Sequence, residues 1–143
     1  MIGAWLGLLG MSAVAAWVDA RRQEIPNRLS LVAAAVGGVL LVLHVLPWTR
    51  LLWAAATWGL YEMLLWRQPG AVGWGDVKWA TVIMGYLGRS GLLVLFLADA
   101  LRLGWSTVRW WRHGRQGRWR DAGAPWAPGA FVGVLVWGLW QWH

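Results

Sequence analysis

Two short strings, whose aspartates are 57 residues apart, contain the residue types that could do chemistry. The first runs from Asp19 to Ile25-Pro26-Asn27, and the second is Gly73-Trp74-Gly75-Asp76-Val77-Lys78. Each string places a carboxylate at the edge of a long apolar stretch, where a charge is costly and usually functional. If the two carboxylates converge, they can share a proton and activate water for hydrolysis. This is the chemistry of an aspartic protease, here at the surface of a membrane.

The composition indicates a membrane protein of one domain. Of the 143 residues, 59% are hydrophobic and 13% are charged, whereas soluble domains have about 25% charged residues. The length fits a single domain covering residues 1–143. The lack of Cys excludes disulfides, a thiol nucleophile and Cys-ligated zinc, and the three scattered His suggest no metal site. We therefore expect neither a metal nor another cofactor.

Apolar runs along the chain predict an all-α membrane bundle of about six transmembrane helices. The runs are Ile2–Val18, Leu29–Leu46, Leu51–Trp66, Val77–Leu87, Gly91–Val108 and Trp126–Trp142. A spanning helix needs about 20 residues and at least about 17. The first, second, fifth and sixth runs meet this requirement. The third contains Glu62 and is marginal. The fourth is short, which indicates either a half-helix or a helix extended by its neighbours inside the bundle.

The distribution of basic residues predicts an orientation with both termini outside. With the first terminus outside, the inside connectors contain ten Lys and Arg residues, and the outside ones contain only Arg50 and Arg89. The opposite orientation would break the positive-inside rule. Asp19 and Asp76 then both lie at cytoplasmic helix ends, as expected for a multi-pass protein of the inner membrane with its chemistry on the cytoplasmic face.

The net charge of +7 raises the question of nucleic acid, but the arginines flank apolar runs. This placement favours topology signals and contacts with anionic lipid headgroups over nucleic-acid binding. The polar segment Arg109–Pro128 is expected to be a cytoplasmic loop against those headgroups. Many of the sixteen Trp residues lie at ends of runs, where they anchor helices at headgroup depth; they are Trp48, Trp66, Trp110, Trp111, Trp126 and Trp142.

The first run resembles a signal peptide only in part. Ala13-Val14-Ala15 has the small residues of a cleavage site, but no positive charge precedes the run, which is also long for such a segment. We therefore expect the run to be retained as a helix. Asp19 at its end is either a solvated residue pairing with Arg22 or Gln23, or a functional one. A carboxylate near a helix C-terminus opposes the helix dipole, so something must compensate its charge.

The residues around the two aspartates have structural interpretations too. Pro26 cannot continue a helix, and Asn27 is a good N-cap for a helix that begins at Arg28. Gly73 and Gly75 permit close backbone approach. Asp76 is itself an acceptable N-cap, although a cap does not need a glycine on both sides of a Trp. These residues support the geometry of the two carboxylates in either interpretation.

Other ionisable residues allow several roles. Lys78 either adjusts the electrostatics of the carboxylate pair or extends to the cytoplasmic interface. Asp99 and Arg102 are one helical turn apart, so they are expected to pair with each other, and Glu62 could join them. Glu62 is alternatively a substrate-contacting residue. The motif Gly129-x-x-x-Gly133 allows another helix to approach closely.

Together, the two strings resemble the type IV prepilin peptidases, the leader peptidases of the GxGD aspartic class. The matching patterns are Asp19-x5-Ile25-Pro26-Asn27 and Gly73-x-Gly75-Asp76-Val77-Lys78, and Pro125-Trp126-Ala127-Pro128 is similar to a third family motif, Pro-Phe-Gly-Pro. The resemblance implies a membrane aspartic endopeptidase with catalytic Asp19 and Asp76. Pro26, Asn27, Gly73, Gly75 and Lys78 would support the site.

The resemblance also implies a substrate and a minimal form of the enzyme. Family substrates are prepilin-like precursors, cut after a Gly between a basic leader and a hydrophobic helix. Bifunctional members have a Cys-rich N-terminal domain and methylate the new N-terminus, and we expect no such methyltransferase domain here. The chain resembles the peptidase-only form found with tight-adherence pili. Ala127 replaces the family Gly of the third motif, which affects local packing more than catalysis.

Two readings compete with the peptidase. A secretion-system scaffold or transporter subunit would explain the apolar runs and the charge bias, but not two aspartates in glycine- and proline-shaped surroundings at one face. A GxGD enzyme that cuts within transmembrane helices would share only Gly73-x-Gly75-Asp76, and Ile25-Pro26-Asn27 argues against it. A pseudopeptidase is disfavoured because both aspartates are present. The sequence does not indicate an oligomeric state.

Overall fold

The computed structural model describes residues 2–22, 25–68, 72–112 and 125–141, and the described part is all-helical. Its elements are α1 (Ile2–Arg22), α2 (Asn27–Val42), α3 (Thr49–Arg67), α4 (Trp74–Leu87), the 3-10 turn η1 (Gly88–Ser90), α5 (Gly91–Arg112) and α6 (Ala127–Trp140). Each apolar run of the sequence forms one of these helices, so the all-α prediction is confirmed. Most of the predicted loop 109–128, with residues 113–124, lies outside the described residues, as does Trp142.

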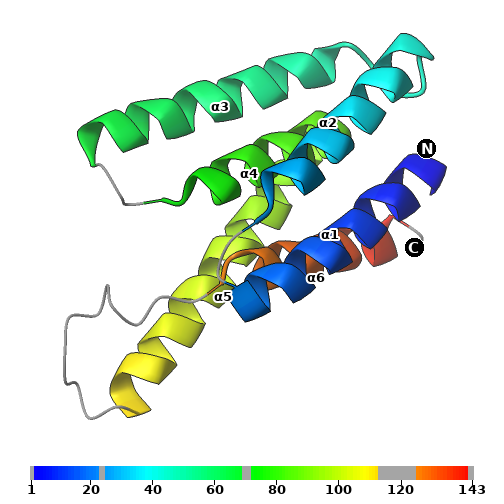
Figure 1. Ribbon diagram of the computed structural model, residues 1–143. Coiled ribbons are helices and arrows are strands. Elements are labelled where there is room, and N and C mark those ends of the chain that lie inside the picture. The colour runs from blue at the N-terminus through cyan, green and yellow to red at the C-terminus, as the bar shows by residue number, and fades with distance from the viewer. Residues whose placement is uncertain (1, 23–24, 69–71, 113–124, 142–143) are drawn as a thin grey trace.

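The helices form two groups joined through α4 (Figure 1). In one group α6 packs between α1 and α5, and in the other α3 and α2 both pack against α4. The short fourth helix is the central one, because most of its side chains are buried against neighbours. Trp79, Ile83 and Met84 are among its fully buried residues. The fourth run is thus part of a 14-residue helix that is packed inside the bundle, and both alternatives predicted for it stay open.

Gly88 separates α4 from α5 and reverses the chain. Its φ of 59° and ψ of −138° lie in a region that residues with a Cβ rarely adopt. A Cβ at this position would also approach the Arg50 side chain at 3.4 Å. Figure 1 shows α5 turning back from the end of α4. Residues similarly distant from the turn on either side, such as Asp76 and Arg102, are thereby brought together.

Helix length and hydropathy identify two candidate membrane spans among the described residues. Two segments, Gly3–Arg22 and Trp74–Arg112, are long and apolar enough to cross a membrane. α2 has 16 residues and α6 has 14, although the corresponding runs are longer. α2 is shortened because the chain turns at His44, whose φ is 55°. The second and sixth runs thus form apolar helices that are shorter than the runs themselves, and their crossing of the membrane stays a prediction.

Close contact between α5 and α6 depends on glycine. A Cβ on Gly129 would lie 2.8 Å from the Ala98 carbonyl oxygen, and one on Gly133 would lie 3.0 Å from the Val94 carbonyl oxygen. Both distances are shorter than ordinary contacts, so only glycine allows the two backbones to approach this closely. The interpretation of Gly129-x-x-x-Gly133 as a packing motif is confirmed.

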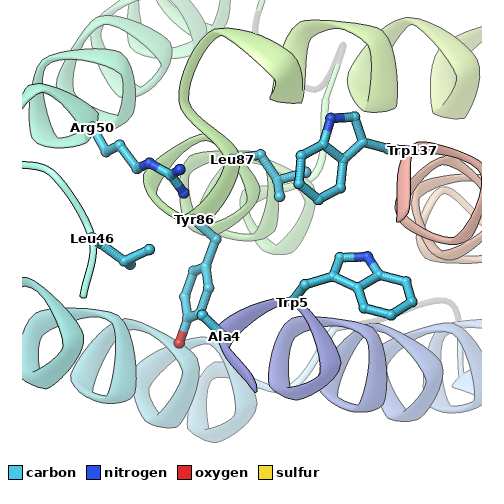
Figure 2. Close-up of a pocket in the computed structure, with 7 residues that line it drawn as sticks. All are labelled: Ala4, Trp5, Leu46, Arg50, Tyr86, Leu87 and Trp137. Atoms are coloured by element: carbon cyan, nitrogen blue, oxygen red, sulfur yellow. The ribbon is translucent and has the colours of Figure 1, made fainter. Parts of the chain in front are cut away.

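A small cavity lies at the end of the bundle where α1 begins and α4 ends. Figure 2 shows its lining side chains converging from α1, α3, α4, α6 and the loop before α3, with Trp5, Arg50, Tyr86 and Trp137 among them. Its volume is about 20 Å³, which suffices for about one water molecule. Asp19 lies some fifteen residues, or about 22 Å, along α1 from this end. No carboxylate lines the cavity, so it is separate from the two aspartates of the sequence strings.

Candidate active site

Asp19 lies on a buried stripe of α1. Leu8, Ser12, Ala15 and Asp19 are spaced by four, three and four residues, which places them on one helical face. All four are nearly inaccessible, and Asp19 is only 3% exposed. This face packs against α6. The spacing is a signal in the sequence that Asp19 points inward rather than into solvent.

The N-terminus of α6 compensates the charge of Asp19. The backbone N–H of Ala127 donates a hydrogen bond of 2.8 Å to Asp19 Oδ2. Ala127 is the first residue of α6, where backbone N–H groups lack partners within the helix and the helix dipole favours a negative charge. Asp19 opposes the dipole of its own helix and is stabilised by that of α6. It is therefore not a solvated end residue of α1.

Trp126 has a different role from the one predicted. It is 3% exposed, and its indole Nε1 donates a 2.9 Å hydrogen bond to Asp99 Oδ1 on α5. A buried, hydrogen-bonded indole is not a membrane-interface anchor, so that assignment of Trp126 is wrong. The motif Pro125–Pro128 instead connects α5, α6 and Asp19. Trp48, Trp66 and Trp111 are exposed and fit the anchoring role.

Asp76 lies in the first turn of α4, three residues after Gly73. Gly73 occupies the N-cap position, so Asp76 is not the N-cap of α4. Arg102 Nη1 of α5 lies 3.4 Å from Asp76 Oδ2 and forms an ion pair with it. The positive dipole end of α4 and this guanidinium both favour a negative charge at Asp76. A Cβ at Gly73 would lie 3.6 Å from Asp76 Oδ2, an ordinary contact.

The two sequence strings pack directly against each other. A Cβ on Gly75 would lie 3.2 Å from the Cβ of Ile25 and 3.3 Å from its backbone nitrogen. Glycine at position 75 therefore lets α4 begin against the connector between α1 and α2, where Ile25 is buried. Pro26, with φ of −62° and ψ of 132°, caps α2 from an extended conformation. These contacts explain why glycine and a rigid connector are needed here.

Lys78 and Asn27 join the same two strings. Lys78 Nζ donates a 2.7 Å hydrogen bond to Asn27 Oδ1 at an exposed position. Asn27 is the first residue of α2 and does not cap it, because Pro26 occupies the N-cap position without a side-chain hydrogen bond. The prediction that Asn27 is the N-cap is therefore wrong. Lys78 is neither paired with the carboxylates nor extended away from the protein. Its hydrogen bond links α4 to the first residue of α2.

Asp19 of α1 and Asp76 of α4 share a set of charged neighbours. Each is within electrostatic reach of Arg102, and Asp76 is within reach of both Asp19 and Asp99. Tyr61 of α3 lies within reach of Asp76, Asp99 and Arg102. One guanidinium thus lies among several carboxylates. Its positive charge reduces the repulsion that would otherwise keep two ionised aspartates apart.

The expected ion pair between Asp99 and Arg102 is not the one that forms. Arg102 binds Asp76, and Asp99 accepts the hydrogen bond from Trp126. Helical spacing alone suggested the pair, but both side chains find partners on other helices. Glu62 is half-buried on α3 and remains without an assigned role. In the described part of the chain, no three His, Asp or Glu side chains gather as a metal site requires.

An all-helical protein with two aspartates at one end of its bundle fits a membrane aspartic peptidase. The model of the type IV leader peptidase family matches residues 2–106, which include Asp19, Asp76 and Arg102. The chain belongs to the type IV leader peptidase family, a family of aspartic peptidases. No match was found among curated proteins, nor among solved structures.

Proposed function

We propose that this protein is a prepilin leader peptidase that uses Asp19 and Asp76 as its catalytic pair. The observation that supports the proposal is that the Asp76 carboxyl group lies within electrostatic reach of Asp19. The aspartates of two strings 57 residues apart reach one end of the bundle and interact electrostatically. Membership of the type IV leader peptidase family supports prepilin-like precursors as substrates. A scaffold would not need two carboxylates in this arrangement.

The proposed mechanism is hydrolysis by activated water. One aspartate is ionised and takes a proton from water, which attacks the scissile carbonyl carbon, while the protonated aspartate gives its proton to the developing oxyanion. The roles then reverse, and the amine leaves as the carbon–nitrogen bond breaks. The two carboxylates titrate as a unit. Arg102 supports this scheme because it offsets one negative charge when the pair carries a single proton.

The proposed substrate has a basic leader, a Gly and a hydrophobic helix, and is cut after the Gly. The test is co-expression of a pilin-like precursor from the same genome with this protein. We expect a shift to the shorter form on a gel, with the new N-terminus following the leader Gly. A precursor in which that Gly is replaced by Val is the matched control and should stay long. If wild-type membranes leave every pilin-like precursor of that genome uncut, the proposed function is wrong.

We further propose an inner-membrane location in which the chain crosses the membrane six times, with both termini outside. The charge bias supports this orientation. The reversal at Gly88 supports it as well, since α4 and α5 then cross in opposite directions. Asp19 and Asp76 would then both face the cytoplasm, where prepilin leaders are found before export. We propose residues 1–143 as a single peptidase domain.

This orientation predicts which sites a membrane-impermeant thiol reagent reaches. Because the chain has no Cys, a single introduced thiol gives an unambiguous signal. Ser90 and Gln68 are both exposed polar positions. In spheroplasts, Ser90→Cys should be labelled directly, and Gln68→Cys only after permeabilisation. Labelling in the reverse order would overturn the proposed orientation.

A further inference from the structure

Two neighbouring side chains of α5 are connected to the two aspartates of the proposed catalytic pair. One connection is direct and the other passes through α6. Asp99 and Arg102 are three residues apart, so they lie on the same face of α5. Arg102 reaches α4 and pairs directly with Asp76 at 3.4 Å. Asp99 reaches α6 and accepts the 2.9 Å hydrogen bond from Trp126. Neither contact is visible from the helical spacing of Asp99 and Arg102.

The route from Asp99 continues to Asp19 through consecutive residues of the α6 N-terminus. The Trp126 side chain is held by Asp99, and the next backbone N–H, that of Ala127, donates to Asp19. Trp126 is 3% exposed and Ala127 is fully buried, so both donors are shielded from bulk water, whereas the acceptor Asp99 is exposed on α5. Trp126 is the N-cap residue of α6, and its carbonyl oxygen accepts a 3.2 Å hydrogen bond from the Ala130 N–H. Its indole contact with Asp99 is a second restraint on the same residue, and both restraints act on the direction of the next backbone N–H, that of Ala127.

The backbone at the start of α6 orients the Asp19 carboxyl group. The Ala127 N–H bonds to Oδ2, and the direction of that bond sets the orientation of the whole carboxyl group. A carboxylate that shares a proton with another must be oriented correctly, because small misplacements of a catalytic group can cost about 100-fold in rate. A shift of the α6 N-terminus is therefore expected to change the rate of catalysis.

We propose that Asp99 and Trp126 are positioning residues for Asp19, and that Arg102 on the same face of α5 positions Asp76. A single helix then sets the geometry of both carboxylates. This inference rests on the proposed function, in which Asp19 and Asp76 do the chemistry. Asp99 does not take part in proton transfer, and only its oxygen, as a hydrogen-bond acceptor, is needed.

The first test is a double-mutant cycle on purified enzyme with a precursor that wild type cleaves. Asp99→Ala and Trp126→Phe should each lower kcat by about 10- to 100-fold with KM little changed. The double variant should be no worse than either single one, because both remove the same hydrogen bond. Asp99→Asn keeps an acceptor oxygen and should restore most of the activity. Additive losses, or an Asp99→Asn enzyme as slow as Asp99→Ala, would overturn the inference.

The second test needs no substrate, so it separates this inference from the proposed function. The chain has only four Asp residues, Asp19, Asp76, Asp99 and Asp121, and carboxyl-labelled aspartate therefore gives four NMR signals in detergent micelles. Trp126→Phe should move the Asp19 signal more than the Asp76 signal, and Arg102→Gln should do the reverse. Trp105→Phe, which changes an exposed Trp of α5, is the control and should move neither. An unmoved Asp19 signal in Trp126→Phe would refute the positioning role even if wild type cleaves nothing.

Discussion

Replacing Asp76 or Asp19 by Asn should lower the rate of precursor cleavage by at least about 100-fold, because an amide can neither take up nor release the shared proton. Loss of either group removes the pair, so each single variant should be about as inactive as the double one. The measurement is the initial rate of cleavage in membranes at equal expression. Substantial activity in Asp76→Asn would contradict the two-aspartate mechanism.

The Asn variants also separate chemistry from structure. The side-chain oxygen of Asn at position 19 can still accept the hydrogen bond from Ala127, so Asp19→Asn should fold normally. Asp19→Leu, in contrast, leaves a buried N–H without an acceptor and should be destabilised. Glu62→Gln, which alters another half-buried carboxylate outside the pair, is the control and should cleave at close to the wild-type rate. A comparable loss in Glu62→Gln would mean that the assignment of the pair is incomplete.

Gly129→Ala should destabilise the fold and impair cleavage together. The added Cβ would lie 2.8 Å from the Ala98 carbonyl oxygen and 2.9 Å from the Ala98 Cα, and both are backbone atoms that cannot rotate away. α6 must therefore move away from α5, at a cost of about 1–3 kcal/mol for overpacking. Gly129 lies two residues after Ala127, so the same movement displaces the N–H that holds Asp19. We expect a lower Tm in detergent and a lower kcat.

The control for this prediction is Gly104→Ala on α5, the helix that Gly129 of α6 packs against. A Cβ at Gly104 would meet nothing within 4 Å, and alanine is the better helix former. This variant should keep the wild-type Tm and activity. If Gly129→Ala melts at the wild-type temperature, the close packing of α5 and α6 is not needed for stability.

Local features of this chain were readable from the sequence. Hydropathy located the helices because a long run of apolar residues is typical of a helix buried in a bundle or a membrane. The reversal near Gly88 followed from the end of one apolar run and the start of the next, and the glycines flanking Trp74 indicated a close approach. The spacing of Leu8, Ser12, Ala15 and Asp19 also indicates that the Asp19 side chain points into the protein. This signal is hard to recognise because nearly all of the surrounding residues are apolar.

Hydrogen-bond partners were not readable in this way. The spacing of Asp99 and Arg102 predicted a local ion pair, yet each residue forms its bond with another helix. Asn27 and Asp76 both had the chemistry of N-caps, but Pro26 and Gly73 occupy those positions. Capping and pairing preferences measured in isolated helices describe the bonds that a residue can form. In a bundle, these local bonds compete with contacts from other helices.

By itself, the sequence determined which segments are helical, which residues could do acid–base chemistry, and the family to which their motifs belong. Only the tertiary structure decided that Asp19 is held by the N-terminus of α6, 108 residues away, and that Arg102 lies beside Asp76. The physical reason is the range of the interactions. Helix formation depends on neighbours within a few turns, whereas the order in which α1, α5 and α6 pack is set by long-range fits such as Gly129 against Ala98.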